Sequence, residues 1–398
     1  MRNRTSRSVL TIVIALMAGG SLAPHSRAAP FVPQTGTEVL ERLRDRPLDA
    51  SARELRQLRA ELARDPQNLA LATRMARRYI EEGRTQGDPR YLGYAQAALR
   101  PWWALPQPPT PVLVLRATIR QSNHEFDAAL EDLARVLKAA PNSGQAWLTR
   151  ATVLQVRGEY AEAARSCEQL SRLAPEFVTA TCLAGVASMT GQAETSYRLL
   201  VRTLQSMPSA SPAEKVWIET ALAEIAVRLG RQDAAESHFK QAFKSSTPDP
   251  YLKGAYADFL LDAGRPAEVV RLLAADARVD GLLLRLALAE QALGASELPA
   301  RVANLQARFD AARARGDRVH MREEARFYSE LRKQPAEALR LAQANWVVQK
   351  EPADARVLLE AALAASDRAA AQPVLDWMRE NKVEDAALAR LAQRLQQS

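Results

Sequence analysis

Hydrophobic positions recur at spacings of three and four residues from about residue 51 to the C-terminus. This period places apolar side chains on one face of an α-helix, and long stretches of strand-like alternation are absent. The periodic segments are separated by Gly, Pro, Asp and Asn, which end helices or form turns. The pattern predicts an all-α protein of short helices.

Several of these break residues are separated by one fixed distance. Pro141 and Pro175 are 34 residues apart, and so are Gly230 and Gly264. A repeat of this length corresponds to one helix-turn-helix unit that stacks on the next. We therefore expect a repeat architecture rather than a single globular core.

The chemistry inside one period is also specific. Small residues let two helices approach, a glycine adopts a positive φ in the turn, and a proline ends the second helix. The small residues are Ala151 and Ala163, the glycine is Gly158 and the proline is Pro175, while Trp147 opens the first helix and Tyr160 follows the turn. The pattern resembles the tetratricopeptide repeat, strongly over residues 66–275 and loosely beyond, where no register can be assigned. The resemblance implies an all-α, right-handed α-solenoid of seven to nine helix pairs with a C-terminal capping helix.

The first pair departs from this pattern. Its helices are predicted over residues 68–82 and 90–100, with Gly83 in a turn that the sequence GRTQGDPRYLGY lengthens. A further linker near residues 209–213 divides the chain into an N-terminal solenoid, residues 51–208, and a C-terminal solenoid with divergent repeats, residues 209–398.

The N-terminus has the pattern of an export signal. Arg2, Arg4 and Arg7 precede an apolar run over residues 9–18, and small residues allow cleavage after Ala28. We therefore predict a signal peptide over residues 1–28 and a flexible leader over residues 29–50. The predicted location is the periplasm of a Gram-negative bacterium.

Charge narrows the range of partners. The chain carries 54 Lys and Arg against 46 Asp and Glu, for a net charge of +8, and without residues 1–28 the charge is +4. Basic and acidic residues alternate along the helices, as in Arg322-Glu323-Glu324, which we interpret as solvated faces. Nucleic acid is therefore not an expected partner. No later segment has 18 consecutive apolar residues, so no membrane span is expected in the mature chain.

Cys167 and Cys182 are the only thiols. In an oxidising compartment they can pair across the turn at Ala174-Pro175. The alternative is that both are small buried side chains on faces that do not meet.

The resemblance also implies which residues line the concave surface, because the first helix of each pair carries the contact positions. Those positions are mixed and rich in amides and hydroxyls, which can bind an extended backbone or a glycan, or can simply face solvent. Family members that grip a terminal carboxylate use Lys and Asn there, and both types are missing. The partner-binding positions are Thr73, Arg77, Val114, Thr118, Gln121, Leu148, Thr152, Gln155, Glu224, Arg228, Tyr251 and Asp258.

An aromatic patch near the N-terminus has two interpretations. Its rings either bind a partner or cap the first repeat, and they belong to Tyr79, Tyr91, Tyr94, Trp102 and Trp103. The remaining tryptophans have amphipathic spacing and are predicted to be core residues: Trp147, Trp217, Trp346 and Trp377.

Signals for catalysis are weak. His124, His238 and His320 are far apart, no zinc-ligand spacing or phosphate-binding loop occurs, and His124 is predicted to be a surface turn residue. No cofactor or metal is expected. The leading hypothesis is a non-catalytic adaptor in the cell envelope that binds a protein or peptide. A glycan-binding chaperone of polysaccharide export is the main alternative, and an unrecognised enzyme is the third.

Overall fold

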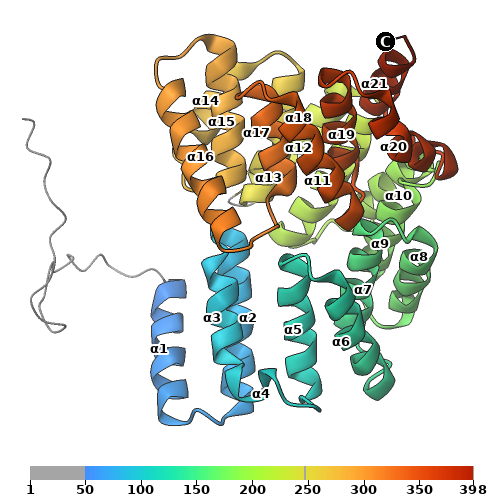
Figure 1. Cartoon of the computed structure of the whole chain (residues 1–398). Helices are drawn as coiled ribbons and strands as arrows, with labels where there is room; N and C mark the ends of the chain where they lie inside the picture. The colour runs from blue at the N-terminus through green and yellow to red at the C-terminus, as the bar shows by residue number, and fades with distance from the viewer. Residues whose placement is uncertain (1–49, 246–247, 398) are drawn as a thin grey trace, which may run out of the picture. The chain divides into compact units, whose positions relative to one another are not determined.

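A computed structural model describes residues 50–245 and 248–397, and within these ranges it contains twenty-one α-helices, one 3-10 turn and no strand (Figure 1). The all-α prediction is confirmed. The predicted signal peptide and the leader up to residue 49 lie outside the described residues.

The described helices form nine pairs, each joined by a short turn, in agreement with the predicted seven to nine. The pairs are α2 and α3 (Leu69–Gln86, Arg90–Ala98), α5 and α6 (Thr110–Ser122, Phe126–Ala139), α7 and α8 (Gly144–Val156, Tyr160–Gln169), α9 and α10 (Glu176–Ala187, Ala193–Gln205), α11 and α12 (Pro212–Arg228, Gln232–Ser245), α13 and α14 (Pro250–Asp262, Pro266–Leu273), α15 and α16 (Asp280–Leu293, Leu298–Ala314), α17 and α18 (Met321–Glu330, Pro335–Val348), and α19 and α20 (Pro352–Ala364, Arg368–Glu380). The remaining elements are α1 (Ala50–Arg64), α4 (Arg100–Trp103), the 3-10 turn η1 (Leu170–Arg172) and α21 (Ala386–Gln397).

Local sequence explains where many of these helices begin. Asn68, Ser143 and Asp249 each accept a hydrogen bond from a backbone N–H in the first turn of α2, α7 and α13. Ser211 and Glu214 form a reciprocal capping box on α11. Proline stands in the first turn of α11, α13, α14, α18 and α19, where its missing N–H costs nothing.

The turn inside a pair needs one residue with a positive φ. Gly158 has φ 80°, as the sequence predicts, while His124 (59°), Lys333 (53°) and Ser366 (54°) take this conformation in pairs that lack the glycine. His124 precedes Gly158 by 34 residues, and Lys333 precedes Ser366 by 33. Lys333 and Ser366 supply the repeat register beyond residue 295 that the sequence pattern does not reveal.

The first pair differs from its prediction. Gly83 does not end the helix: α2 continues to Gln86, and Gly87 takes the positive φ of 64°. The following segment is broken at Leu99, which separates α3 from α4.

The first helices of successive pairs form a continuous inner layer. Contacts run from α2 to α5, then through α7, α9, α11, α13, α15 and α17 to α19. In the pair α7 and α8, the small residues Ala151 and Ala163 are almost fully buried and permit close approach. This layer is the concave side on which the groove residues were predicted.

Pairs far apart in sequence also touch. Lys350, before α19, donates its backbone N–H to the Val156 carbonyl at 2.7 Å, and Glu384, before α21, accepts the N–H of Ala193 at 2.6 Å. A Cβ at Gly158 would lie 3.6 Å from the Cβ of Lys350. We call these contacts the seam: it joins the early repeats, α5 to α10, to the late repeats, α17 to α21.

Aromatic side chains continue the seam into the core. Trp346 and Trp377 pack edge to face with ring centroids 5.3 Å apart, and the Trp377 indole donates to the Tyr160 hydroxyl at 3.2 Å. The predicted core position of these two tryptophans is confirmed. Trp147 is half-buried and Trp217 is 38% exposed, so the core prediction for Trp217 is wrong.

The hydrophobic core also crosses the predicted boundary at residues 208 and 209. Leu200 of α10 belongs to one cluster with Ile218 and Leu222 of α11. The division into two solenoids at this point stays a prediction.

Candidate interaction surface

Among the predicted groove residues on α5 and α7, three polar side chains keep solvent contact. Thr152 is exposed, and Gln121 and Gln155 are half-buried. The Gln155 amide packs against Gly185 on α9: a Cβ added at Gly185 would lie only 3.3 Å from Gln155 Oε1. Leu148 and Val114 are half-buried and pack at the edge of the core. This part of the inner layer presents amides and a hydroxyl over an apolar floor.

Two other groove residues are placed differently from their prediction. Thr73 and Thr118 are buried, and their hydroxyls donate to carbonyls one turn earlier, Leu69 at 2.8 Å and Val114 at 3.1 Å. Neither hydroxyl is available to a partner. Arg77, on α2, is exposed.

A second group lies on α11 and α13. Tyr251 donates its hydroxyl to Glu224 Oε1 at 2.5 Å, while 64% of the tyrosine remains exposed. Burial raises the pKa of Glu224, and the negative charge of Glu224 raises the pKa of Tyr251. The ring is therefore held in place by its hydroxyl, and its face is open.

Further along α13, two carboxylates bind arginines of later helices. Asp258 accepts from Arg326 of α17 at 2.6 Å and also pairs with Arg285 of α15. Asp262 binds both terminal nitrogens of Arg356 on α19, at 2.6 and 2.7 Å. Burial opposes ionisation of Asp258, but the two guanidinium groups outweigh it and hold its pKa below the usual range.

We define the acidic stripe as Glu224, Tyr251, Asp258 and Asp262. The first three were predicted as partner-binding residues, and the structure brings all four to the inner layer, where Asp258 and Asp262 are engaged by the chain itself. Arg228, also predicted to bind a partner, donates to the hydroxyl of Ser188, the residue after α9, at 2.6 Å.

The inner layer contains a charged cluster that the sequence interpretation missed. Arg322 pairs with Glu323, Glu351 and Asp354 at 3.2 to 3.4 Å. Burial and the neighbouring Asp354 raise the pKa of Glu351, although Arg322 opposes the shift. The interpretation of Arg322-Glu323-Glu324 as a solvated face is wrong, since Glu324 is also buried. The contacts that bury them come from helices too far away for a local charge pattern to reveal.

The aromatic patch packs largely into the first repeat. Tyr79 is buried, and its ring lies 6.1 Å from Tyr91 and 5.6 Å from Tyr94. Trp102 and Trp103 are half-buried against the same core cluster, and only Tyr94, at 49%, is well exposed. This arrangement favours the capping interpretation over a partner-binding patch.

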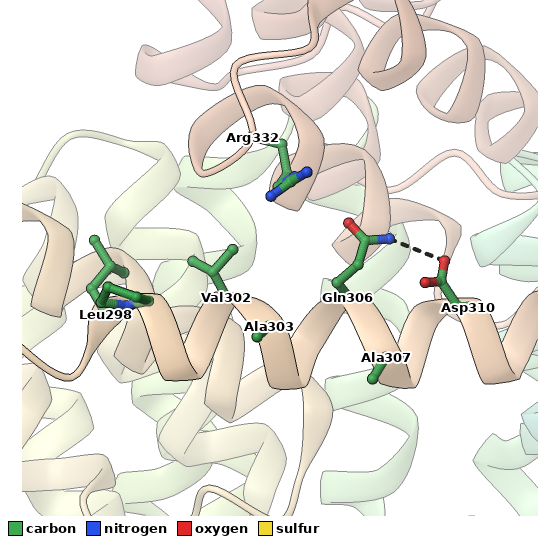
Figure 2. A pocket seen from close by; sticks show the side chains of 8 residues that line it. Leu298, Val302, Ala303, Gln306, Ala307, Asp310 and Arg332 are labelled. Atoms are coloured by element: carbon green, nitrogen blue, oxygen red, sulfur yellow. Dashed lines mark hydrogen bonds between the residues drawn. The ribbon is translucent and has the colours of Figure 1, made fainter. Parts of the chain in front are cut away.

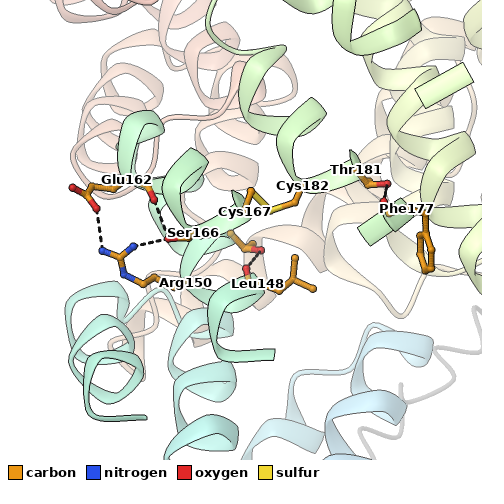
Figure 3. The surroundings of a disulfide bond; sticks show 9 residues. Leu148, Arg150, Glu162, Ser166, Cys167, Phe177, Thr181 and Cys182 are labelled. Carbon is orange, nitrogen blue, oxygen red and sulfur yellow. Dashed lines mark hydrogen bonds and ion pairs between the residues drawn. A yellow bond between two sulfur atoms is a disulfide. The ribbon is translucent and has the colours of Figure 1, made fainter. Parts of the chain in front are cut away.

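Figure 3 shows Cys167 of α8 joined to Cys182 of α9 by a disulfide, with their Cα atoms 5.6 Å apart. Both are buried, and Figure 3 shows Leu148 and Thr181 close to them. The bond ties the pair α7 and α8, which carries the fullest repeat pattern in the sequence, to the pair that follows it.

His124 and His238 make structural contacts. His124 is half-buried rather than a surface residue, stacks on Phe126, and has its pKa lowered to about 4 by burial and by Arg322. His238 links Glu219, 2.6 Å from Nδ1, to the Tyr197 hydroxyl, 2.8 Å from Nε2. Burial raises the pKa of Tyr197, which opposes use of its oxygen as a nucleophile.

A shallow pocket of about 550 Å³ lies along α16. Figure 2 shows its lining, which includes Leu298, Val302 and Ala303 of α16 and Arg332. Within the described ranges, no three His, Cys, Asp or Glu side chains are grouped to hold a metal ion. Over the same part of the chain, no helix combines the length and apolar character needed to cross a bilayer.

No protein-family model matches the chain, and no curated protein sequence does. Solved structures do match. A chain of the APC/C hetero-tetramer Cut9–Hcn1 is 13% identical with a TM-score of 0.50, and the match covers 83% of this chain and 63% of that one. A tetratricopeptide repeat protein from Parabacteroides merdae is 17% identical over 59% of this chain and 90% of its own, with a TM-score of 0.44. At this identity the likeness to the Cut9–Hcn1 chain is one of fold: an α-helical repeat solenoid.

Proposed function

We propose that this chain, which has the tetratricopeptide-repeat fold, is a non-catalytic scaffold in the cell envelope that binds an extended protein segment on its inner layer. The fold is typically an interaction scaffold, because stacked pairs create a long concave surface and no enclosed reaction site. The observation that carries the proposal is the unbroken run of first helices, which aligns accessible amide and hydroxyl groups of α5 and α7.

Such groups suit a peptide backbone. Gln121 and Gln155 can each donate and accept a hydrogen bond. The exposed Thr152 oxygen can accept one, while its hydrogen is donated to the Leu148 carbonyl at 3.0 Å. An extended segment exposes unpaired N–H and C=O groups along its length, so a row of amides matches it without a particular side-chain sequence.

The proposed location is the periplasm. The N-terminal pattern supports export, and the Cys167–Cys182 disulfide suits an oxidising compartment. Cell fractionation, with determination of the N-terminus of the mature protein, tests this proposal. We expect the protein in the periplasmic fraction beginning at Ala29. A cytosolic chain that retains Met1 would contradict it.

Cross-linked affinity purification from cells tests the scaffold role. The inner variant carries Gln121→Glu, Thr152→Glu and Gln155→Glu, which add three negative charges along α5 and α7. The control carries the same charges on exposed positions of other faces: Gln96→Glu, Gln169→Glu and Ser171→Glu. We leave Thr118 unchanged because it is buried, and both variants must keep the helical circular dichroism of the wild type.

The expected result is that specific proteins co-purify with the wild type and the control but not with the inner variant. Identical profiles for all three would overturn the proposed binding surface. Turnover of a substrate that depends on His124, His238 or His320 would overturn the non-catalytic assignment.

A further inference from the structure

The carboxylates of α13 are spaced to bind a row of cationic groups. Tyr251, Asp258 and Asp262 stand at i, i+7 and i+11, which places them along one face of the helix. Glu224 of α11 extends this face through its hydrogen bond to Tyr251. The acidic stripe is thus a continuous surface on the inner layer.

Guanidinium groups already occupy half of this stripe, and they come from distant parts of the chain. Arg326 is 68 residues from Asp258, and Arg356 is 94 residues from Asp262. The Arg356–Asp262 pair has the two-pronged geometry in which arginine binds a carboxylate most selectively. The structure therefore shows that the stripe accepts arginine side chains.

These arginines remain exchangeable. In the Arg356–Asp262 pair, 33% and 36% of the side chains are accessible to solvent, and in the Arg326–Asp258 pair the values are 19% and 29%. The Arg356–Asp262 pair is therefore open enough to solvent for a competing guanidinium group to reach Asp262. Asp258 is more enclosed and is also held by Arg285, so it stays paired when Arg326 leaves.

Among the described residues, no arginine is paired with the other half of the stripe, although the charge of Arg228 acts on Glu224. Glu224 is hydrogen-bonded to the Tyr251 hydroxyl, and the ring of Tyr251 is open. An aromatic face beside a carboxylate suits a guanidinium group, which can stack on the ring and pair with the acid.

We propose that Arg326 and Arg356 form an autoinhibitory pair that occupies, from within the chain, the carboxylates of α13 that bind arginine side chains of an extended partner segment. The partner segment enters over Tyr251 and Glu224, and its arginines replace Arg326 at Asp258 and Arg356 at Asp262. This inference rests on the proposed function, because it names the chemistry of the segment bound by the inner layer.

The test uses a fluorescent octa-arginine peptide and measures its dissociation constant by anisotropy at one fixed ionic strength. The open variant is Arg326→Gln/Arg356→Gln. Its matched control, Arg165→Gln/Arg379→Gln, removes the same charge from exposed pairs within single helices. A quadruple variant adds Asp258→Asn and Asp262→Asn to the open variant.

We expect the open variant to bind the peptide at least tenfold more tightly than the wild type and the control, and the quadruple variant to lose that gain. Equal affinity of the open variant and the control would overturn the proposal. So would a gain that persists in the quadruple variant, since binding would then not use the stripe. If the open variant loses its helical circular dichroism, Arg356→Gln alone is tested in its place. We then expect a severalfold higher affinity for octa-arginine than that of the wild type, and an unchanged affinity would contradict the proposal.

The two proposals fail separately. The co-purification variants do not include the stripe, so loss of partners on changing Gln121, Thr152 and Gln155 supports the scaffold role even if octa-arginine shows no gain. Conversely, if the open variant gains affinity for octa-arginine but the inner variant still co-purifies the same proteins, the stripe stands as a binding site and the proposed binding surface on α5 and α7 is wrong.

Discussion

The turn residue within each pair shows how one position determines the repeat. At Gly158, Gly230 and Gly264 a positive φ has no side-chain cost, and these glycines made the period visible in the sequence. Lys333 and Ser366 adopt the same conformation without that signal. The register of the late repeats therefore could not be predicted, because φ at a lysine or serine is imposed by the packing on either side.

Gly264 offers a clean test of this turn position. It has φ 68°, and no neighbouring atom lies within 4 Å of the position that a Cβ would take, so Gly264→Ala isolates the backbone effect. We expect the variant to lose roughly 1 to 2 kcal/mol of unfolding free energy, measured in urea. Gly93→Ala is the control: that glycine is helical with equally open surroundings, and the substitution should gain roughly 0.5 to 1 kcal/mol. Equal effects at both positions would contradict the assigned turn.

His124 makes stability depend on pH. Its pKa in the folded state is about 4, below the unfolded value of 6.5, so its neutral form is favoured by folding. The contribution of neutral His124 to the free energy of unfolding is complete above pH 6.5 and is lost as the pH falls through 4. This contribution amounts to at most about 3 kcal/mol. His124→Asn keeps a residue that tolerates φ 59° and removes the titration.

Urea unfolding of wild type and His124→Asn at pH 7, 5.5 and 4 measures this difference. We expect the wild type to lose more stability than the variant on acidification. Curves that fall in parallel would show that His124 is not buried in its neutral form.

Among the individual elements, the pairs with the strongest sequence pattern were the easiest to predict. α7 and α8 contain all the signals, from Ser143 at the N-cap to Gly158 in the turn. α2 was predicted too short because Gly83 was taken as its end, although a glycine within a helix costs only about 1 kcal/mol and tertiary contacts can offset it. The contacts of α17 and α19 with α13 were not predictable. Arg326 of α17 and Arg356 of α19 bind carboxylates of α13, and a local charge pattern shows only pairs along one helix.

The disulfide fixes α8 to α9 across η1. Closing a loop with a sequence separation of 15 stabilises the fold by about 3 kcal/mol on the chain-entropy model. We expect Cys167→Ala/Cys182→Ala to lose this amount in urea unfolding, with the helical circular dichroism retained. Alanine is chosen because a serine hydroxyl would be buried there. A loss of unfolding free energy below about 1 kcal/mol would contradict the claim that the disulfide stabilises the fold by constraining the unfolded chain.

For the whole molecule, the sequence predicted a solenoid but not that its late repeats return to its early ones. A periodic pattern describes neighbours, and stability in such proteins is usually a sum of repeat and nearest-neighbour terms. The contact of Tyr160 with Trp377 joins residues 217 apart in the chain. Such long-range contacts have no local signature. Asp258 was therefore predicted to face a partner, whereas in the structure it is paired with Arg285 and Arg326 of the same chain.

The seam predicts that damage to a late repeat spreads to an early one. Trp377→Ala should lose roughly 3 to 5 kcal/mol, and should accelerate hydrogen exchange over residues 153–163 as well as around α20. Trp217→Ala, at a position 38% exposed, is the control and should cost less and leave that segment protected. Faster exchange confined to α20 and its sequence neighbours would contradict the seam.

Closure of the late repeats onto the early ones can be tested by a cysteine cross-link between Gly158→Cys and Lys350→Cys. Their Cβ atoms would lie 3.6 Å apart, within the range for a disulfide, although 192 residues separate them. Gly158→Cys with Lys382→Cys is the control, because Lys382 lies against Gly191 instead. We expect oxidation to yield the linked 158–350 peptide by mass spectrometry and no 158–382 peptide. Absence of the 158–350 link under conditions that keep the Cys167–Cys182 bond would contradict the closure.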